Sequence, residues 1–165
     1  MTASVLPVQP LQAAAFARFG WLIEGDGRRS RSINAGTSER METAGVLQLD
    51  AQGGQPCLAV FRARAQAPEG PWHTLERHRL GSQSFIPLAG ARCLVLVALG
   101  DPRPDPATLA AFLVDGRRGY TLHPGVWHHA LIALDDGDFV VIERAGPRED
   151  CEIAHLTTPV RLALP

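Results

Sequence analysis

The chain has 165 residues, of which 45% are hydrophobic and 20% charged, and its formal net charge at pH 7 is −1. These values are ordinary for one soluble globular domain, and the absence of a long basic run or a membrane-length apolar run excludes nucleic acid and membrane as partners. All 16 basic residues are arginine, which excludes chemistry through a lysine Schiff base. We therefore expect a single domain over residues 1–165.

The cysteines and the N-terminal residues bear on where the protein acts. Cys57, Cys93 and Cys151 are odd in number, widely spaced and outside any CxxC arrangement, so they predict neither a disulfide framework nor a zinc knuckle. The N-terminal residues lack the basic stretch and apolar run of a signal peptide. The sequence therefore predicts a cytoplasmic protein.

The first half of the chain predicts one helix followed by short strands. Leu11, Ala15 and Phe19 recur at spacings of four before Gly20, which predicts an amphipathic helix over residues 11–19. A strand is predicted over residues 21–24, and the polar, aperiodic residues 25–32 predict a loop. Two further strands are predicted over residues 46–50 and 57–62.

The second half predicts mostly strands. They are expected over residues 73–78, 84–88, 92–99, 120–122, 127–134, 139–144 and 160–164. One helix is predicted over residues 106–114, because Asp105 can cap it, Pro106 suits its first turn, and Leu109, Phe112 and Leu113 form an apolar face. Many short strands separated by Gly, Pro and Asp indicate a barrel or a sandwich.

Two segments, residues 76–90 and 123–129, contain four of the six histidines. Alternation along a strand puts Glu76 and His78 on one face and Arg77 on the other, and it separates His128 from His129. If the first face and His128 line a barrel interior, two imidazoles and a carboxylate meet, a set that suits a divalent transition metal with open positions. Gln83 would then be a weak fourth ligand or a hydrogen-bond donor to substrate. No organic cofactor is expected.

Two alternatives remain open for these residues. The same side chains could line a polar pocket without a metal, or the histidines could make structural hydrogen bonds while Glu76 pairs with an arginine. An anionic substrate would need a bidentate arginine. Because Arg77 faces away from the predicted ligands, we expect Arg40 to bind the substrate and Arg77 to brace the barrel wall or a dimer contact.

The spacing of the two segments is similar to the two motifs of the cupin barrel. The first cupin motif has two histidines one residue apart, then a Glu, then a Gly after six residues; Glu76, His78, Gln83 and Gly90 occupy those positions. In the second motif a Pro/Gly turn leads to a single His, as Pro124-Gly125 here leads to His128. The resemblance implies an all-β, cupin-type double-stranded β-barrel of two antiparallel sheets, with a few short peripheral helices.

At family level, the chain resembles the ureidoglycolate lyases, formerly described as ureidoglycolate hydrolases. The segments that carry the resemblance are Ile33–Thr37 with Arg40, Glu76–His78, Leu80–Gln83, Phe85–Pro87 and Gly125–His129. Three departures are Met41-Glu42-Thr43, where the family usually has an aromatic residue and His-Asp, and Arg79 and Ala130, which replace prolines.

The resemblance implies an enzyme, usually dimeric, that cleaves ureidoglycolate to glyoxylate and urea in allantoin and purine degradation. It implies catalytic roles for Glu76, His78, Gln83 and His128, and substrate-binding roles for Asn34, Thr37, Arg40 and Ser82. The expected partners are a small-molecule substrate and a second copy of the chain. The alternatives are a diverged cupin enzyme for another small hydroxy or ureido acid, and a non-catalytic cupin that binds a small anion.

Overall fold

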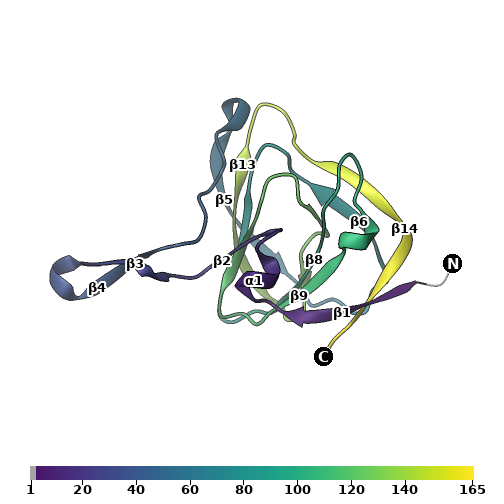
Figure 1. Cartoon of the computed structure of the whole chain (residues 1–165), viewed down its shortest axis with the longest axis horizontal. Coiled ribbons are helices and arrows are strands. Elements are labelled where there is room, and N and C mark those ends of the chain that lie inside the picture. Colours follow the sequence, from purple (N-terminus) through teal and green to yellow (C-terminus); the bar gives the residue numbers. More distant parts are fainter. Residues whose placement is uncertain (1–2) are drawn as a thin grey trace.

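The computed structural model describes residues 3–165, which form a closed β-barrel with few helical turns (Figure 1). The strands are β1 Ser4–Pro10, β2 Gly20–Ile23, β3 Asp26–Ile33, β4 Ser38–Glu42, β5 Gln55–Ala63, β6 Trp72–Arg77, β7 Gln83–Pro87, β8 Cys93–Ala98, β9 Ala110–Val114, β10 Gly119–Leu122, β11 Trp127–His128, β12 Ile132–Ala133, β13 Gly137–Ala145 and β14 Glu152–Ala163. The helical pieces are α1 Ala13–Phe16, η1 Asn34–Gly36, η2 Ala51–Gly53 and η3 Pro106–Thr108. The predicted all-β barrel with short peripheral helices is confirmed.

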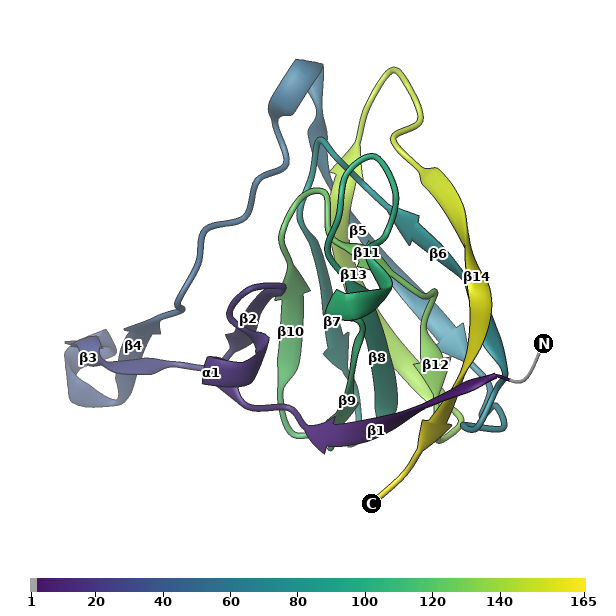
Figure 2. The ribbon, with the colours of Figure 1, turned by 45° about the vertical axis from the view of Figure 1, so that its right-hand side comes forward.

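The strands form two layers. The larger sheet runs β11-β6-β14-β1-β9-β8-β12, and it closes on itself because β11 pairs with β8 as well as with β6. The second layer is a five-stranded sheet in the order β2-β10-β7-β13-β5 (Figure 2). One feature differs from the expected pairs of antiparallel strands: β1 pairs in parallel with both β14 and β9.

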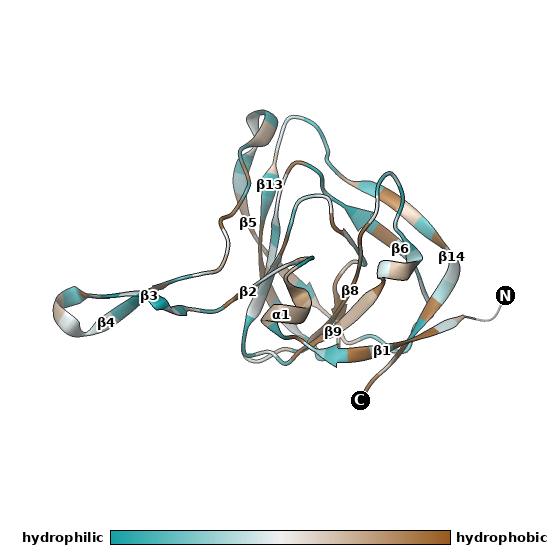
Figure 3. Cartoon of the chain, viewed as in Figure 1, coloured by the Kyte–Doolittle hydropathy of each residue, from teal (hydrophilic) through white to brown (hydrophobic). Residues whose placement is uncertain are grey.

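The core consists of two hydrophobic clusters, and the larger sheet contributes to both. One cluster lies between the sheets, with Phe85 and Phe139 from the five-stranded sheet and Phe112 from the larger one. The other joins side chains of the closed ring, including Leu75 and Trp127. Strand β8 is buried along its whole length because its alternate residues enter the two clusters. Strand β14 has one buried face, and its hydropathy alternates along the ribbon (Figure 3).

An isolated β-hairpin projects from the barrel. Strands β3 and β4 pair only with each other, η1 forms their turn, and the hairpin stands away from both sheets (Figure 1). We call residues 26–42 the arm. The predicted loop over residues 25–32 is therefore wrong. Its arginines and serines carry no apolar period because neither face of the hairpin is buried in this chain.

Both predicted helices are shorter than expected. The first is the four-residue α1, after which Phe19 turns back into the core. Asp105 does accept a hydrogen bond from the Ala107 amide, but η3 then ends and residues 110–114 form β9. Their side chains are apolar on both faces because β9 lies between the two clusters, and such a run is ambiguous between helix and strand.

Several strand predictions also change. Residues 46–50 form no strand and instead run outside the five-stranded sheet toward η2. The predicted strand over residues 127–134 is interrupted between β11 and β12, and β1 was not predicted at all. The remaining strands lie where predicted, with ends that differ by a few residues, although β14 begins eight residues earlier. No helix among residues 3–165 is long and apolar enough to cross a membrane.

Candidate metal centre and adjoining cavity

Two paired strands bring Glu76 and His128 together. In the ladder between β6 and β11 these two residues are direct partners, so their side chains leave the sheet on the same face. His128 Nε2 lies 3.6 Å from Glu76 Oε1. His78, just beyond the end of β6, joins them, and one ligand atom from each of the three residues lies within 4.8 Å of the others.

Backbone carbonyls fix the orientation of both imidazoles. His78 Nδ1 donates to the Asp150 carbonyl at 2.9 Å, and His128 Nδ1 donates to the Val126 carbonyl at 3.0 Å. Because a carbonyl can only accept, each Nδ1 carries a proton, and the neutral form of either ring then has its lone pair on Nε2. Both Nε2 atoms are buried and have no hydrogen-bond partner among residues 3–165.

Burial also sets the charge of His128. It lowers the pKa of this imidazole to about 4, against 6.5 for an ordinary histidine, although the bond to the Val126 carbonyl opposes the shift. His128 is therefore neutral at pH 7. Two imidazole nitrogens without other partners and a carboxylate make a donor set that fits a divalent transition metal.

A cavity of about 330 Å³ adjoins the centre. His78 lines it, together with Ser82, Gln83, Glu143 and Arg148. Gln83 donates from Nε2 to Glu143 Oε2 at 2.8 Å, and its Oε1 is buried without a partner among the described residues. The Ser82 hydroxyl, on the cavity wall, accepts from the Gln48 amide at 2.9 Å.

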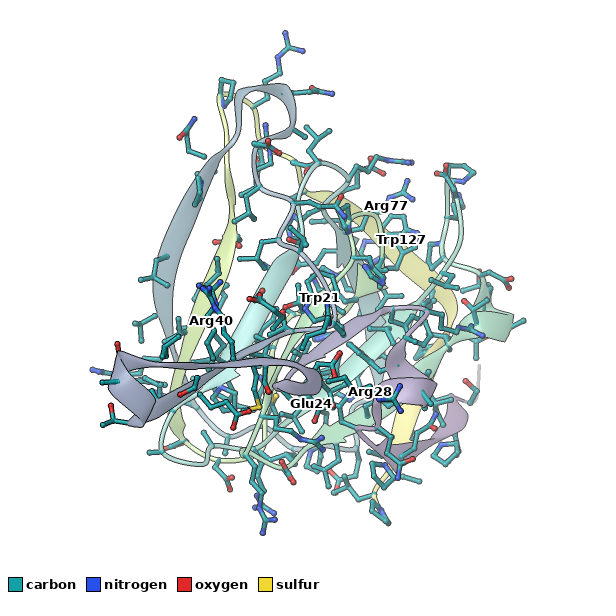
Figure 4. All side chains as sticks on the ribbon, turned by 60° about the vertical axis from the view of Figure 1, so that its left-hand side comes forward. Trp21, Glu24, Arg28, Arg40, Arg77 and Trp127 are labelled. Atoms are coloured by element: carbon teal, nitrogen blue, oxygen red, sulfur yellow. The ribbon has the colours of Figure 1, made fainter. Side chains whose placement is uncertain are left out.

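Within one chain the structure does not bring Asn34, Thr37 and Arg40 to this cavity, so their substrate-binding roles stay a prediction. All three lie on the arm, where Asn34 contacts Ser38, Thr37 bonds back to the Asn34 carbonyl, and Arg40 pairs with Glu42. Figure 4 shows Arg40 on the arm, apart from the barrel residues Arg77 and Trp127. The physical reason is that the arm leaves the barrel instead of folding over it.

Arg77 lies on the opposite face of β6 from Glu76, as alternation predicts. It is 1% exposed, its guanidinium stacks 4.2 Å from the Trp127 ring centroid, and it donates to Glu152 at 2.6 and 2.9 Å. His129 also stays outside the centre, with its ring against Trp72. Sequence reasoning missed Glu143 and Arg148, which line the cavity from β13 and the loop after it. A loop arginine carries no periodic signal that would single it out.

Comparison with known proteins points to one family. The profile of a family described as "Ureidoglycolate lyase" matches residues 3–163. A ureidoglycolate lyase of Burkholderia cepacia is 42% identical over 151 residues, covering 90% of this chain and 84% of the relative. One of Azotobacter vinelandii is 40% identical over 149 residues, covering 90% of each chain, and one of Pseudomonas putida F1 is 36% identical over 160 residues, covering 96% of each.

Proposed function

The chain belongs to the ureidoglycolate lyase family, and from this membership we propose that it cleaves ureidoglycolate to glyoxylate and urea. The observation that supports this activity most directly is the pair of buried, unpartnered Nε2 atoms beside Glu76, next to a polar cavity of about 330 Å³. Such a centre suits a small oxygen-rich substrate.

The reaction needs one proton removed and one delivered. Ureidoglycolate is a carbinolamine, so loss of its hydroxyl proton lets the oxygen form the aldehyde while the carbon–nitrogen bond breaks. The bonding electron pair leaves with the urea nitrogen, which must then take up a proton. No oxidant or reductant takes part, so the reaction needs only proton transfers, which acid–base groups at the cavity can carry out.

We assign Glu76, His78 and His128 to a divalent transition metal. When bound, such an ion supplies Lewis acidity that lowers the pKa of a substrate hydroxyl. With these three residues acting as ligands, the carboxylates that remain beside the cavity are Glu143, Glu149 and Asp150, and Glu143 is the one that Gln83 contacts. It accepts the hydroxyl proton and returns it to the departing nitrogen, while the amide of Gln83 orients it through their 2.8 Å hydrogen bond.

Arg148 takes the role first expected of Arg40. Its guanidinium lines the cavity and makes no hydrogen bond or ion pair to any of residues 3–165, whereas Arg144 nearby is bound to the carbonyls of Ala51 and Gln52. A guanidinium that is not otherwise engaged can bind the substrate carboxylate in bidentate form.

The activity is tested by incubating purified protein with racemic ureidoglycolate and following glyoxylate. Production well above the spontaneous background is expected, with Glu143→Gln lowering kcat and Arg148→Ala raising KM by about 10- to 100-fold. Glu149→Gln, which removes a neighbouring charge on the same cavity, is the matched control and should change neither by more than about 2-fold. A rate equal to the background contradicts the activity. Turnover of another ureido acid, or binding without turnover, would favour the two alternatives.

The metal has a separate test. Elemental analysis of protein purified without chelator should find about one transition-metal ion per chain, and adding metal to stripped protein should raise its melting temperature. His128→Gln should abolish that rise. Stripped protein that melts unchanged on adding Zn²⁺, Mn²⁺, Co²⁺ or Ni²⁺ would return the three residues to direct acid–base roles.

We further propose a place for the protein in the cell. An enzyme that releases urea and glyoxylate fits the degradation of allantoin, itself a product of purine breakdown. The chain is proposed to act in the cytoplasm and as a homodimer. Sedimentation of the purified protein and imaging of a tagged chain test the last two statements.

A further inference from the structure

One loop contacts two of the three residues of the candidate metal centre. Residues 146–151 join β13 to β14, at the top of the barrel in Figure 2. The Asp150 carbonyl in this loop accepts from His78 Nδ1 at 2.9 Å. The next residue, Cys151, donates from Sγ to Glu76 Oε2 at 3.8 Å. Two consecutive residues of the loop therefore contact two of the three proposed ligands.

Asp150 also holds the backbone that carries His78. His78 lies just beyond the end of β6, where the ladder between β6 and β14 has ended. There the Asp150 carboxylate accepts from two backbone amides, that of Arg79 through Oδ1 at 3.1 Å and that of Leu80 through Oδ2 at 2.6 Å. The carboxylate and the carbonyl of one residue thus fix the position of His78 and keep the proton of its ring on Nδ1.

The thiol of Cys151 contacts the oxygen of Glu76 that faces away from His128. Glu76 Oε1 lies 3.6 Å from His128 Nε2, whereas Oε2 is the oxygen that the thiol contacts. An ionised carboxylate can only accept, so the thiol is the donor. Among residues 3–165, the ligand atoms within 4.8 Å of one another come from Glu76, His78 and His128, and Cys151 Sγ is not one of them. The thiol therefore acts through Glu76.

We propose that Asp150 and Cys151 are positioning residues, which hold His78 and Glu76 in the orientation that binds a divalent transition metal. This inference rests on the metal assigned above and adds the residues that orient its ligands. Removing a hydrogen-bond partner of a metal ligand typically costs about 10- to 100-fold in metal affinity. The metal affinity should therefore depend on both residues, although neither coordinates the ion.

Titration of stripped full-length protein with Co²⁺ alone, followed by calorimetry and by the visible absorption of the bound ion, tests the role of Asp150. Asp150→Ala should raise the Co²⁺ Kd by about 10- to 100-fold and shift the absorption bands, because His78 loses its fixed orientation. Asp150→Asn keeps one acceptor oxygen and should give an intermediate Kd. Asp136→Ala is the matched control, since the Asp136 carboxylate also accepts from a backbone amide, that of Ala65 at 2.7 Å, and lines a different cavity. It should lower the melting temperature and leave the Co²⁺ Kd and absorption unchanged.

A pair of substitutions tests Cys151. Cys151→Ala removes the donor to Glu76 and should raise the Co²⁺ Kd by about 10-fold. Cys151→Ser keeps a hydroxyl donor, so its Kd should stay within about 3-fold of the wild-type value. Cys93→Ala is the control, because it removes a thiol that is buried in the core. It should lower the melting temperature without changing the Kd.

The outcomes separate positioning from folding and from the reaction. A folded Asp150→Ala protein with the wild-type Co²⁺ Kd and absorption overturns the role of Asp150, and a Cys151→Ala protein with the wild-type Kd overturns that of Cys151. If Asp150→Ala fails to fold, Asp150→Asn takes its place and must bind Co²⁺ more weakly than the wild type. A wild type that binds no Co²⁺ overturns this inference together with the metal assignment. A wild type that binds Co²⁺ but does not cleave ureidoglycolate refutes the reaction alone, and weaker Co²⁺ binding by the variants would still support the positioning roles.

Discussion

Replacing Arg77 with alanine should destabilise the fold without impairing substrate binding. The side chain is buried within the ring, stacks on Trp127, and donates to Glu152, Asp101 and the carbonyls of Gly100 and Pro102. Alanine removes the stack, the donors and the packed methylenes together. Glu76 lies on the opposite face of the same strand, so the metal centre should keep its geometry.

The expected loss follows from the surroundings of Arg77. Breaking a buried ion pair by deleting one partner typically costs about 3–5 kcal/mol. Here both carboxylate partners can be rehydrated, because the Glu152 and Asp101 side chains are 44% and 66% exposed, and both still pair with Arg79. We therefore expect a value near the lower limit, about 3 kcal/mol, which lowers the melting temperature by about 6–12 °C in a domain of this size.

Urea and thermal unfolding measure this loss, and ureidoglycolate turnover at 25 °C measures the site. Arg92→Ala is the control, because it removes an exposed pair with Asp135 and should change stability little. Arg77→Met, which restores apolar volume without charge, should recover part of the loss. The reasoning is refuted if Arg77→Ala melts like Arg92→Ala, or if it loses substrate affinity while melting normally.

Three further outcomes are expected. The folded-state pKa of His128 is depressed to about 4 from 6.5, so the unfolded chain binds a proton that the folded protein does not between these two pH values. The free energy of unfolding of metal-free protein should therefore be highest above pH 6.5 and fall by ~3 kcal/mol as the pH falls to 4. Urea unfolding at several pH values should show this dependence, and His128→Gln should remove it. Gly20→Ala should fail to fold or melt far lower in circular dichroism, because the new methyl would lie 1.8 Å from the Thr121 carbonyl oxygen in the adjacent strand. Burial raises the pKa of Cys93 to about 12, so mass spectrometry should find native Cys93 unmodified by iodoacetamide at pH 8 and alkylated only after unfolding; labelling of the native thiol would show that the core admits solvent.

The fold was largely predictable because its strands are short, apolar and separated by turn residues. The wrong secondary-structure predictions fall on segments that lie between the two hydrophobic clusters or that contact neither cluster. Residues 110–114 are apolar at successive positions because β9 serves both clusters, so their pattern could not distinguish strand from helix. Residues 26–33 have one apolar side chain, Ile33, because the arm has no buried face within the chain. Strand β1 joins two distant segments, β9 and β14, and long-range pairing leaves no local signal.

The candidate centre could be predicted to the extent that alternation along a strand fixes the face on which each side chain lies. Alternation placed Glu76 and His78 on one side of β6 and Arg77 on the other, and the β6–β11 register then added His128. The cavity beside it was less accessible to this reasoning. Glu143 reaches it from the five-stranded sheet and Arg148 from a loop, and neither residue is near the others in sequence. Arg40 was grouped with the cavity because its segment resembles the family and because Arg77 faces away from the ligands, and within one chain Arg40 lies on the arm.

The two residues of β11 tie two parts of the molecule to a single stretch of backbone. Trp127 packs against Arg77 inside the ring, and its neighbour His128 belongs to the candidate metal centre. His128 pairs with Glu76 of β6 on one side, and both residues pair with β8 on the other. A shift of this strand would therefore break the closure of the barrel between β6 and β8 and also displace the imidazole of His128. Substitutions that change the substrate should therefore be rare at His128. Differences in specificity between relatives should instead occur in the β13–β14 loop, whose backbone takes no part in closing the ring of strands.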